Sequence, residues 1–140
     1  MSEHVPAVAA FLDGLVSGEW QPMEPHYRDD VIFQGTVPRW YFAIEGRQNV
    51  IEQMGGWFPF SGELSDLQVM ENGEGAVVEF ERRWLRPSDS SAAGNETVGV
   101  RQAHIFLFDE EGRIREQHGH CAGIWDNATF EEIEQAHATV

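Results

Sequence analysis

Apolar and polar residues alternate from residue 97 to residue 126, and this alternation predicts two long strands that fold back on each other. The polar run at 109–112 contains a glycine and is typical of the turn of a hairpin. The returning strand is expected over 114–125. One face of the hairpin carries Gln102 and His104 among aromatic residues, which is too polar for a plain core. We interpret this face as the wall of a small-molecule pocket.

Helical spacing of apolar residues marks further segments. Between residues 5 and 16 an apolar stripe predicts a helix, and Gly18 stands where that helix would end. A short helical segment is expected at 22–27, since proline is accepted in a first turn. Two more helices are expected, one over 47–54 closed by Gly55 and Gly56, and one after Asp126 with Thr129 and Glu132 at capping-box spacing.

The remaining alternating segments predict strands at 31–37, 64–71 and 75–86, the last two joined by a turn at Asn72-Gly73. Residues 38–42 are interpreted as a loop with large apolar rings, and 87–95 as a flexible connection. Helices gathered on one side of a mainly antiparallel, strongly curved sheet make an α+β fold that encloses a cone-shaped hollow. At this length we expect a single domain, residues 1–140.

Composition excludes several classes of function. Nine Lys and Arg against 24 Asp and Glu give a net charge of -15, which disfavours binding to nucleic acid or anionic membranes. The one cysteine, Cys121, excludes an internal disulfide and a cysteine-rich zinc site. No apolar run reaches membrane-spanning length and no export signal is recognisable, so a cytoplasmic protein is expected.

Two regions of the chain resemble a known family. The segments LVSGEW, PHYRDDVIFQGTVP and IEGRQNVIEQM, together with AHIFLFDEEGRIREQHGHCAGIWD, are similar to the nuclear transport factor 2-like superfamily. The branch with SnoaL-like polyketide cyclases and ketosteroid isomerases resembles the chain most. The resemblance implies a cone-shaped α+β barrel and a homodimer through the outer sheet face, where Ile105, Leu107 and Trp125 would need cover. It implies a reaction less sharply, because this fold hosts isomerases, dehydratases, cyclases, epoxide hydrolases and binding modules.

The resemblance also implies positions for catalytic groups. Isomerases of the family hold a general-base carboxylate at the position of Gly35, and cyclases or epoxide hydrolases often hold an acid at that of Gly119. Neither acid is present here, and the two glycines are expected to widen the cavity.

Three polar residues match family positions that face the cavity, and we assign them catalytic roles. His104 matches a carboxylic acid that donates to a developing oxyanion, Arg82 an arginine of the epoxide-hydrolase triad, and Tyr27 a tyrosine of the isomerase network. His104 would move a proton or donate to an enolate-like oxygen, while Arg82 and Tyr27 orient the carbonyl. Phe11 stands where isomerases have their oxyanion-hole tyrosine.

The expected substrate pocket is mostly aromatic, with a few polar groups. Its residues are Phe11, Phe33, Trp40, Met54, Trp57, Phe58, Trp84, Gln102, Phe106, Gln117 and Cys121. Cys121 is interpreted as a small wall residue, since nothing nearby in the sequence marks a base that would activate its thiol.

Other interpretations stay open at these positions. His104 could simply satisfy a hydrogen bond in the core. A buried Arg82 needs an internal acid such as Glu24 or Glu79, or a ligand carbonyl or carboxylate, and an inverted register would place it in a solvated charge cluster. His118 and His120 could bind one metal ion, but the alternation that turns His104 inward turns them outward, so no metal is expected unless a bulge swaps the faces.

The sequence therefore favours a cofactor-independent cyclase, isomerase or dehydratase that acts on a hydrophobic polyketide-like or polycyclic carbonyl compound, as in secondary metabolism. The aromatic walls would hold the substrate in a reactive conformation. The alternative is a non-catalytic small-molecule-binding or dimerisation module, which the missing carboxylates favour.

Overall fold

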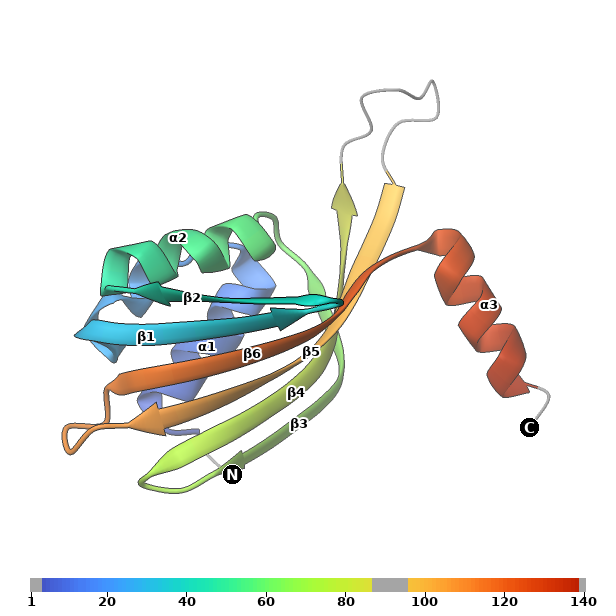
Figure 1. Ribbon diagram of the computed structural model, residues 1–140. Coiled ribbons are helices and arrows are strands. Elements are labelled where there is room, and N and C mark those ends of the chain that lie inside the picture. The colour runs from blue at the N-terminus through green and yellow to red at the C-terminus, as the bar shows by residue number, and fades with distance from the viewer. Residues whose placement is uncertain (1–3, 87–95, 139–140) are drawn as a thin grey trace.

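A six-stranded, strongly curved sheet with helices against one of its faces forms the body of the molecule (Figure 1). The computed structural model describes residues 4–86 and 96–138. Its elements are α1 (Pro6–Ser17), the 3₁₀ helix η1 (Gln21–His26), β1 (Tyr27–Val37), β2 (Trp40–Glu45), α2 (Arg47–Trp57), β3 (Glu63–Glu71), β4 (Gly75–Arg86), β5 (Glu96–Phe108), β6 (Ile114–Asp126) and α3 (Asn127–Ala138).

The sheet has the strand order β2-β1-β6-β5-β4-β3, so β2 and β3 are its edges and the sheet does not close. Only the β1–β6 pair is parallel among these neighbours, and the others are antiparallel. The α+β class and the curved, mainly antiparallel sheet predicted from the sequence are confirmed. The hairpins over β3–β4 and β5–β6 also form as the alternation predicted.

Glycine marks the end of α1 as predicted, but it does not mark the end of α2. Gly18 ends α1 as expected, with a left-handed φ of 78° and its N–H bonded to the carbonyl of Gly14 at 2.8 Å. In contrast, α2 continues through Gly55 and Gly56 to Trp57. Glycine weakens a helix by only about 1 kcal/mol, and the next residue, Phe58, is fully buried, so packing of the following chain keeps the turn intact.

The prediction of a loop at 38–42 is wrong. A two-residue turn at Pro38 and Arg39 leads straight into β2, which pairs with β1 from Val37↔Trp40 onward. The aromatic residues that suggested a loop are good strand formers. β1 is also longer than predicted, because it begins at Tyr27.

The C-terminal helix is capped by Asp126 rather than by Thr129. The Asp126 carboxylate accepts from the backbone N–H and the hydroxyl of Thr129, at 2.9 and 2.8 Å. α3 lies apart from α1 and α2, beyond the end of β6 (Figure 1). It is anchored by Phe130, whose ring lies 5.7 Å from that of Trp125 and 3.8 Å from the guanidinium of Arg83.

The core lies between the sheet and the pair α1 and α2. No helix in the two described ranges is long and apolar enough to cross a membrane. The expected flexible connection at 87–95 lies outside the described residues.

Candidate functional site

His104 points from β5 into the core, as the alternation predicted, and is fully buried. Its imidazole is packed among aromatic rings, not exposed to an open hollow. The ring centroids within 5.0 to 6.3 Å of it are those of Phe11, Phe33, Trp57, Phe58, Phe80 and Phe106. The expected hollow around His104 is therefore filled by side chains from α1, α2 and the sheet.

Four buried polar side chains form one continuous chain of hydrogen bonds, here called the polar chain: Tyr27, Gln117, His104 and Gln102. The Tyr27 hydroxyl donates to Oε1 of Gln117 at 2.5 Å. Nε2 of Gln117 lies 2.9 Å from Nδ1 of His104, and Nε2 of His104 lies 2.7 Å from Oε1 of Gln102. Three of the four are fully buried and Gln102 is 4% exposed, so the chain runs from the core to one partly accessible amide.

Burial keeps both titratable members of the polar chain neutral. Desolvation, with a smaller repulsion from His120, lowers the pKa of His104 to about 3. Desolvation also raises the pKa of Tyr27 far above its ordinary value, against a smaller opposite effect of the hydrogen bond to Gln117. The interpretation of His104 as a residue that moves a proton near neutral pH is therefore unfavourable in this structure. A neutral imidazole can still accept one hydrogen bond and donate one.

Arg82 is fully buried on β4 and donates hydrogen bonds to backbone carbonyl oxygens. Its Nε donates to the carbonyl oxygen of Leu15 at 2.6 Å, and Nη2 donates to that of Phe60. Leu15 lies in the last turn of α1, where free carbonyls form the negative end of the helix dipole. The guanidinium also lies over the rings of Phe58 and Trp84. Burial lowers the pKa of Arg82 to about 10, so it stays charged at neutral pH.

The sequence offered Glu24 or Glu79 as partners of Arg82, and both expectations are wrong. Glu24 accepts from Gln21 at the surface, and Glu79 is exposed on the opposite face of β4. A helix end supplied the partial negative charge instead, and backbone carbonyls leave no signal in a sequence. Arg82 thus ties α1 to the segment that follows α2.

A cavity of about 390 Å³ lies where the accessible end of the polar chain reaches the surface. It is enclosed by the β1–β2 turn, the end of α2 and the segment after it, and the strands β4, β5 and β6. The lining residues are Val37, Pro38, Gly56, Trp57, Pro59, Phe60, Trp84, Arg86, Val100, Gln102, Cys121, Gly123 and Ile124.

Four residues of the predicted pocket line this cavity: Trp57, Trp84, Gln102 and Cys121. Trp40 is 69% exposed on β2, and it does not line the cavity. The remaining predicted wall residues are buried in the core and do not line it either, namely Phe11, Phe33, Met54, Phe58, Phe106 and Gln117. Reasoning from strand periodicity missed the wall formed by turns and helix ends, because those residues follow no period.

The two glycines at the family's acid positions do not widen a cavity. A Cβ at Gly35 would lie 2.5 Å from Cζ of Phe42, and a Cβ at Gly119 would lie 2.8 Å from Cε1 of His104. Both values are too short for real Cβ contacts. Aromatic rings occupy the space that an acid would need, so the expectation of a wider cavity is wrong at both positions.

His118 and His120 point away from the core, as their alternation with His104 predicted. His118 is half-buried and His120 is exposed on β6. Two irregularities interrupt the β5–β6 pairing, one between Val100 and Gln102 and one between Leu107 and Phe108, and both fall outside the stretch that holds the two histidines. Within residues 4–86 and 96–138 no three His, Cys, Asp or Glu side chains are grouped as metal ligands would be.

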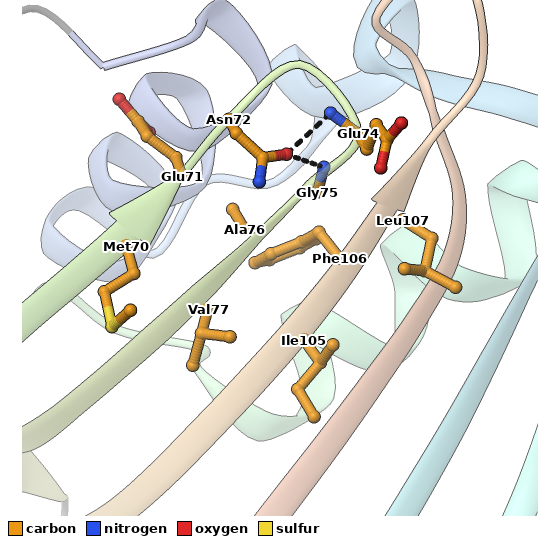
Figure 2. A pocket seen from close by; sticks show the side chains of 10 residues that line it. All are labelled: Met70, Glu71, Asn72, Glu74, Gly75, Ala76, Val77, Ile105, Phe106 and Leu107. Carbon is orange, nitrogen blue, oxygen red and sulfur yellow. Dashed lines mark hydrogen bonds between the residues drawn. The ribbon is translucent and has the colours of Figure 1, made fainter.

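A second groove of about 400 Å³ lies on the outer face of the sheet, and Figure 2 shows the side chains that line it. Met70, Val77 and Ile105 are 75%, 40% and 37% exposed there. The hydrogen bonds drawn in it join Oδ1 of Asn72 to the backbone N–H groups of Glu74 and Gly75 in the β3–β4 turn, and neither connects the groove to the polar chain. The first cavity, which holds the end of the polar chain, is therefore the candidate site.

Comparison with known proteins assigns the family. A family model described as SnoaL-like domain matches residues 8–117, which is most of the chain. The chain belongs to the SnoaL-like domain family. None of the curated proteins matches this SnoaL-like domain significantly.

Solved structures with the same fold have low sequence identity to this SnoaL-like domain. An NTF2-like protein from Anabaena variabilis ATCC 29413 is 20% identical, with a TM-score of 0.64 over 88% of this chain and 96% of that one. A candidate SnoaL-like polyketide cyclase from Shewanella putrefaciens CN-32 is 13% identical, with a TM-score of 0.66 over 94% and 85%. SalBIII, an epoxide hydrolase/cyclase-like enzyme in pyran ring formation of the polyether salinomycin, is 14% identical, with a TM-score of 0.61 over 86% and 92%.

Proposed function

We propose that this SnoaL-like domain binds a hydrophobic, polycyclic or polyketide-like carbonyl compound in the 390 Å³ cavity and acts on it as a cofactor-independent cyclase, isomerase or dehydratase. The observation that carries the proposal is the position of Gln102. This amide is the buried polar group at the cavity wall, between apolar surfaces that include Trp57 and Trp84. Apolar walls with one convergent polar group are typical of sites that bind and orient a small molecule.

The chemistry that this site supports is positioning more than proton transfer. Holding a flexible substrate with its reacting atoms close together can lower a barrier without an acid or a base. A buried amide that donates to the substrate oxygen would add stabilisation where negative charge develops. Ring closure and double-bond isomerisation next to a carbonyl both fit this pairing of shape with one polar contact. The polyketide cyclases and the cyclase-like SalBIII among structures of this fold support the same class.

Two neighbouring glycines of α2 provide a matched test of the cavity. Gly56 lines the cavity and Gly55 does not, and a Cβ at either position would meet nothing within 4 Å. We expect Gly56→Phe to weaken binding of a polycyclic ketone about tenfold or more, which corresponds to about 1.4 kcal/mol. Gly55→Phe should leave the affinity unchanged. Titration followed by tryptophan fluorescence measures both, and equal losses in the two variants would contradict the assigned cavity.

Turnover separates the enzyme from the alternative, a binding module of the same fold. Mass spectrometry of a panel of polycyclic and polyketide-like ketones after incubation should show an isomer of the same mass or a product that has lost water. Compounds that bind with the Gly56-dependent affinity but remain unchanged would favour the binding module.

We also propose that the outer face of the sheet holds two copies of the chain together. The apolar residues Met70, Val77 and Ile105 are partly exposed there (Figure 2). Sedimentation at micromolar concentration is expected to show a dimer, and Ile105→Asp is expected to give monomers. Val16→Asp, at an exposed apolar position on α1, should remain dimeric. A monomeric wild-type protein would overturn this assignment.

A further inference from the structure

The hydrogen bonds of the polar chain can run in one of two directions, and the hydroxyl of Tyr27 selects between them. Oε1 of Gln117 can only accept, so Tyr27 donates to it. Gln117 then donates from Nε2 to Nδ1 of His104, which places the imidazole hydrogen on Nε2. That N–H donates to Oε1 of Gln102, whose NH₂ group is the last donor of the chain.

The reversed direction is less favourable because it leaves a buried donor without an acceptor. Gln117 would have to donate to the oxygen of Tyr27, and the hydroxyl hydrogen of Tyr27 would then need another acceptor. Tyr27 is fully buried, and Gln117 is the hydrogen-bond partner of its hydroxyl among the described residues. An unsatisfied buried donor is one of the less favourable arrangements in a protein.

Gln102, whose NH₂ group ends the polar chain, is a wall residue of the candidate cavity. Gln102 is 4% exposed and lines this cavity, and within the described ranges its Nε2 has no protein acceptor. Nε2 of Gln102 is not one of the solvent-inaccessible side-chain atoms that lack a hydrogen-bond partner. In the described ranges those atoms are Oε2 of Glu71 and Nη1 of Arg82. Its hydrogen atoms therefore remain available to a molecule in the cavity.

We propose that Gln102 is the hydrogen-bond donor of the cavity, and that His104, Gln117 and Tyr27 are positioning residues that fix the direction of its amide. The inference rests on the proposed function and adds the polarity of the ligand. The site takes a neutral ligand that offers an oxygen acceptor, such as a ketone or quinone. It disfavours a ligand that must donate at this point, such as an alkylammonium group. Among the described residues, Arg86 is the one cation on the cavity wall, and it donates to the carboxylate of Glu96 at 2.8 Å.

The ligand part of the test uses two rigid compounds of nearly equal shape, 9-fluorenone and fluorene, which differ by a carbonyl oxygen. We expect the wild-type protein to bind the ketone about tenfold more tightly, as for one hydrogen bond to a buried neutral donor. Gln102→Met keeps the shape of the side chain without the donor, so the preference should disappear while the affinity for fluorene stays the same. The sole cysteine, Cys121, lines the same cavity, and its protection from a thiol reagent reports occupancy independently.

The positioning part of the test determines the direction of the hydrogen bonds in the polar chain, without any ligand. Long-range ¹H–¹⁵N NMR of the His104 ring is expected to show the hydrogen on Nε2. Tyr27→Phe removes the group that sets the direction, so we expect a mixture of both tautomers and a reduced ketone preference, with fluorene binding unchanged. Loss of folding alone would not produce this pattern.

The outcomes separate the inference from the function on which it rests. A hydrogen on Nδ1 of His104, or equal affinity for the two compounds in the wild-type protein, would overturn the inference and leave the cavity as a binding site. A hydrogen on Nε2 with binding of neither compound would overturn both the proposed function and Gln102 as a ligand donor. The combination of Nε2–H, ketone preference and its loss in Gln102→Met supports the inference.

Discussion

Gly119→Ala is expected to lower the free energy of unfolding by about 3 kcal/mol, since overpacking in a core typically costs about 1–3 kcal/mol and a buried hydrogen-bonded network is disturbed as well. The new Cβ would lie 2.8 Å from Cε1 of His104, and 3.1 Å from both Nδ1 of His104 and Cε1 of Phe33. Both residues are fully buried, so neither ring can move into solvent. Urea denaturation followed by circular dichroism measures the loss.

Gly35→Ala is the matched control, because Gly35 and Gly119 face each other across β1 and β6. Its Cβ would be even closer to a ring, 2.5 Å from Cζ of Phe42. Phe42 is only half-buried on the edge strand β2, so its ring can move outward. We expect a loss below about 1 kcal/mol, as is usual where a neighbour can shift. Equal losses in the two variants would show that burial of the neighbouring ring does not decide the effect.

Gly35 and Gly119 stand at the two positions where the family resemblance implies acidic residues. A carboxylate at position 119 would have to displace His104 from the polar chain, and one at position 35 would have to displace Phe42. The side chains of His104 and Phe42 therefore fill the space that the two carboxylates would occupy. Restoring either acid alone should disturb packing, because the neighbouring side chains have taken its space.

The direction in which side chains point could be predicted from the sequence. Alternation along β4 and β5 gave the inward positions of Arg82 and His104, since period-two patterning decides the face of a strand. The same alternation turned His118 and His120 outward. Local signals were enough for these assignments.

What the inward side chains meet could not be predicted in the same way. Whether His104 faces a hollow or a cluster of rings depends on Phe11 and Phe58, which are brought to it by elements far away in the chain. Arg82 finds its partners on the backbone, at Leu15 and Phe60, where residue identity carries no information. The cavity wall comes partly from a turn that was interpreted as part of a loop.

The second large effect is expected in the pH dependence of stability. The ordinary pKa of histidine, about 6.5, applies in the unfolded chain, whereas burial lowers the pKa of His104 to about 3 in the folded protein. Between these values the unfolded chain binds a proton that the folded protein does not. The contribution is therefore fully present above pH 6.5 and is lost as the pH falls toward 3, by roughly 1–1.5 kcal/mol per pH unit.

His104→Gln isolates this contribution from the many carboxylates, which titrate in the same range. A glutamine at position 104 can accept from Gln117 and donate to Gln102, so it preserves the polar chain without a titratable group. The free energy of unfolding, measured in urea at several pH values, should fall more steeply in the wild-type protein than in His104→Gln. Between pH 6.5 and pH 4 the difference should reach about 3 kcal/mol. Parallel curves would show that His104 keeps a nearly ordinary pKa. Water would then reach the imidazole ring, although the packed aromatic cluster should exclude it.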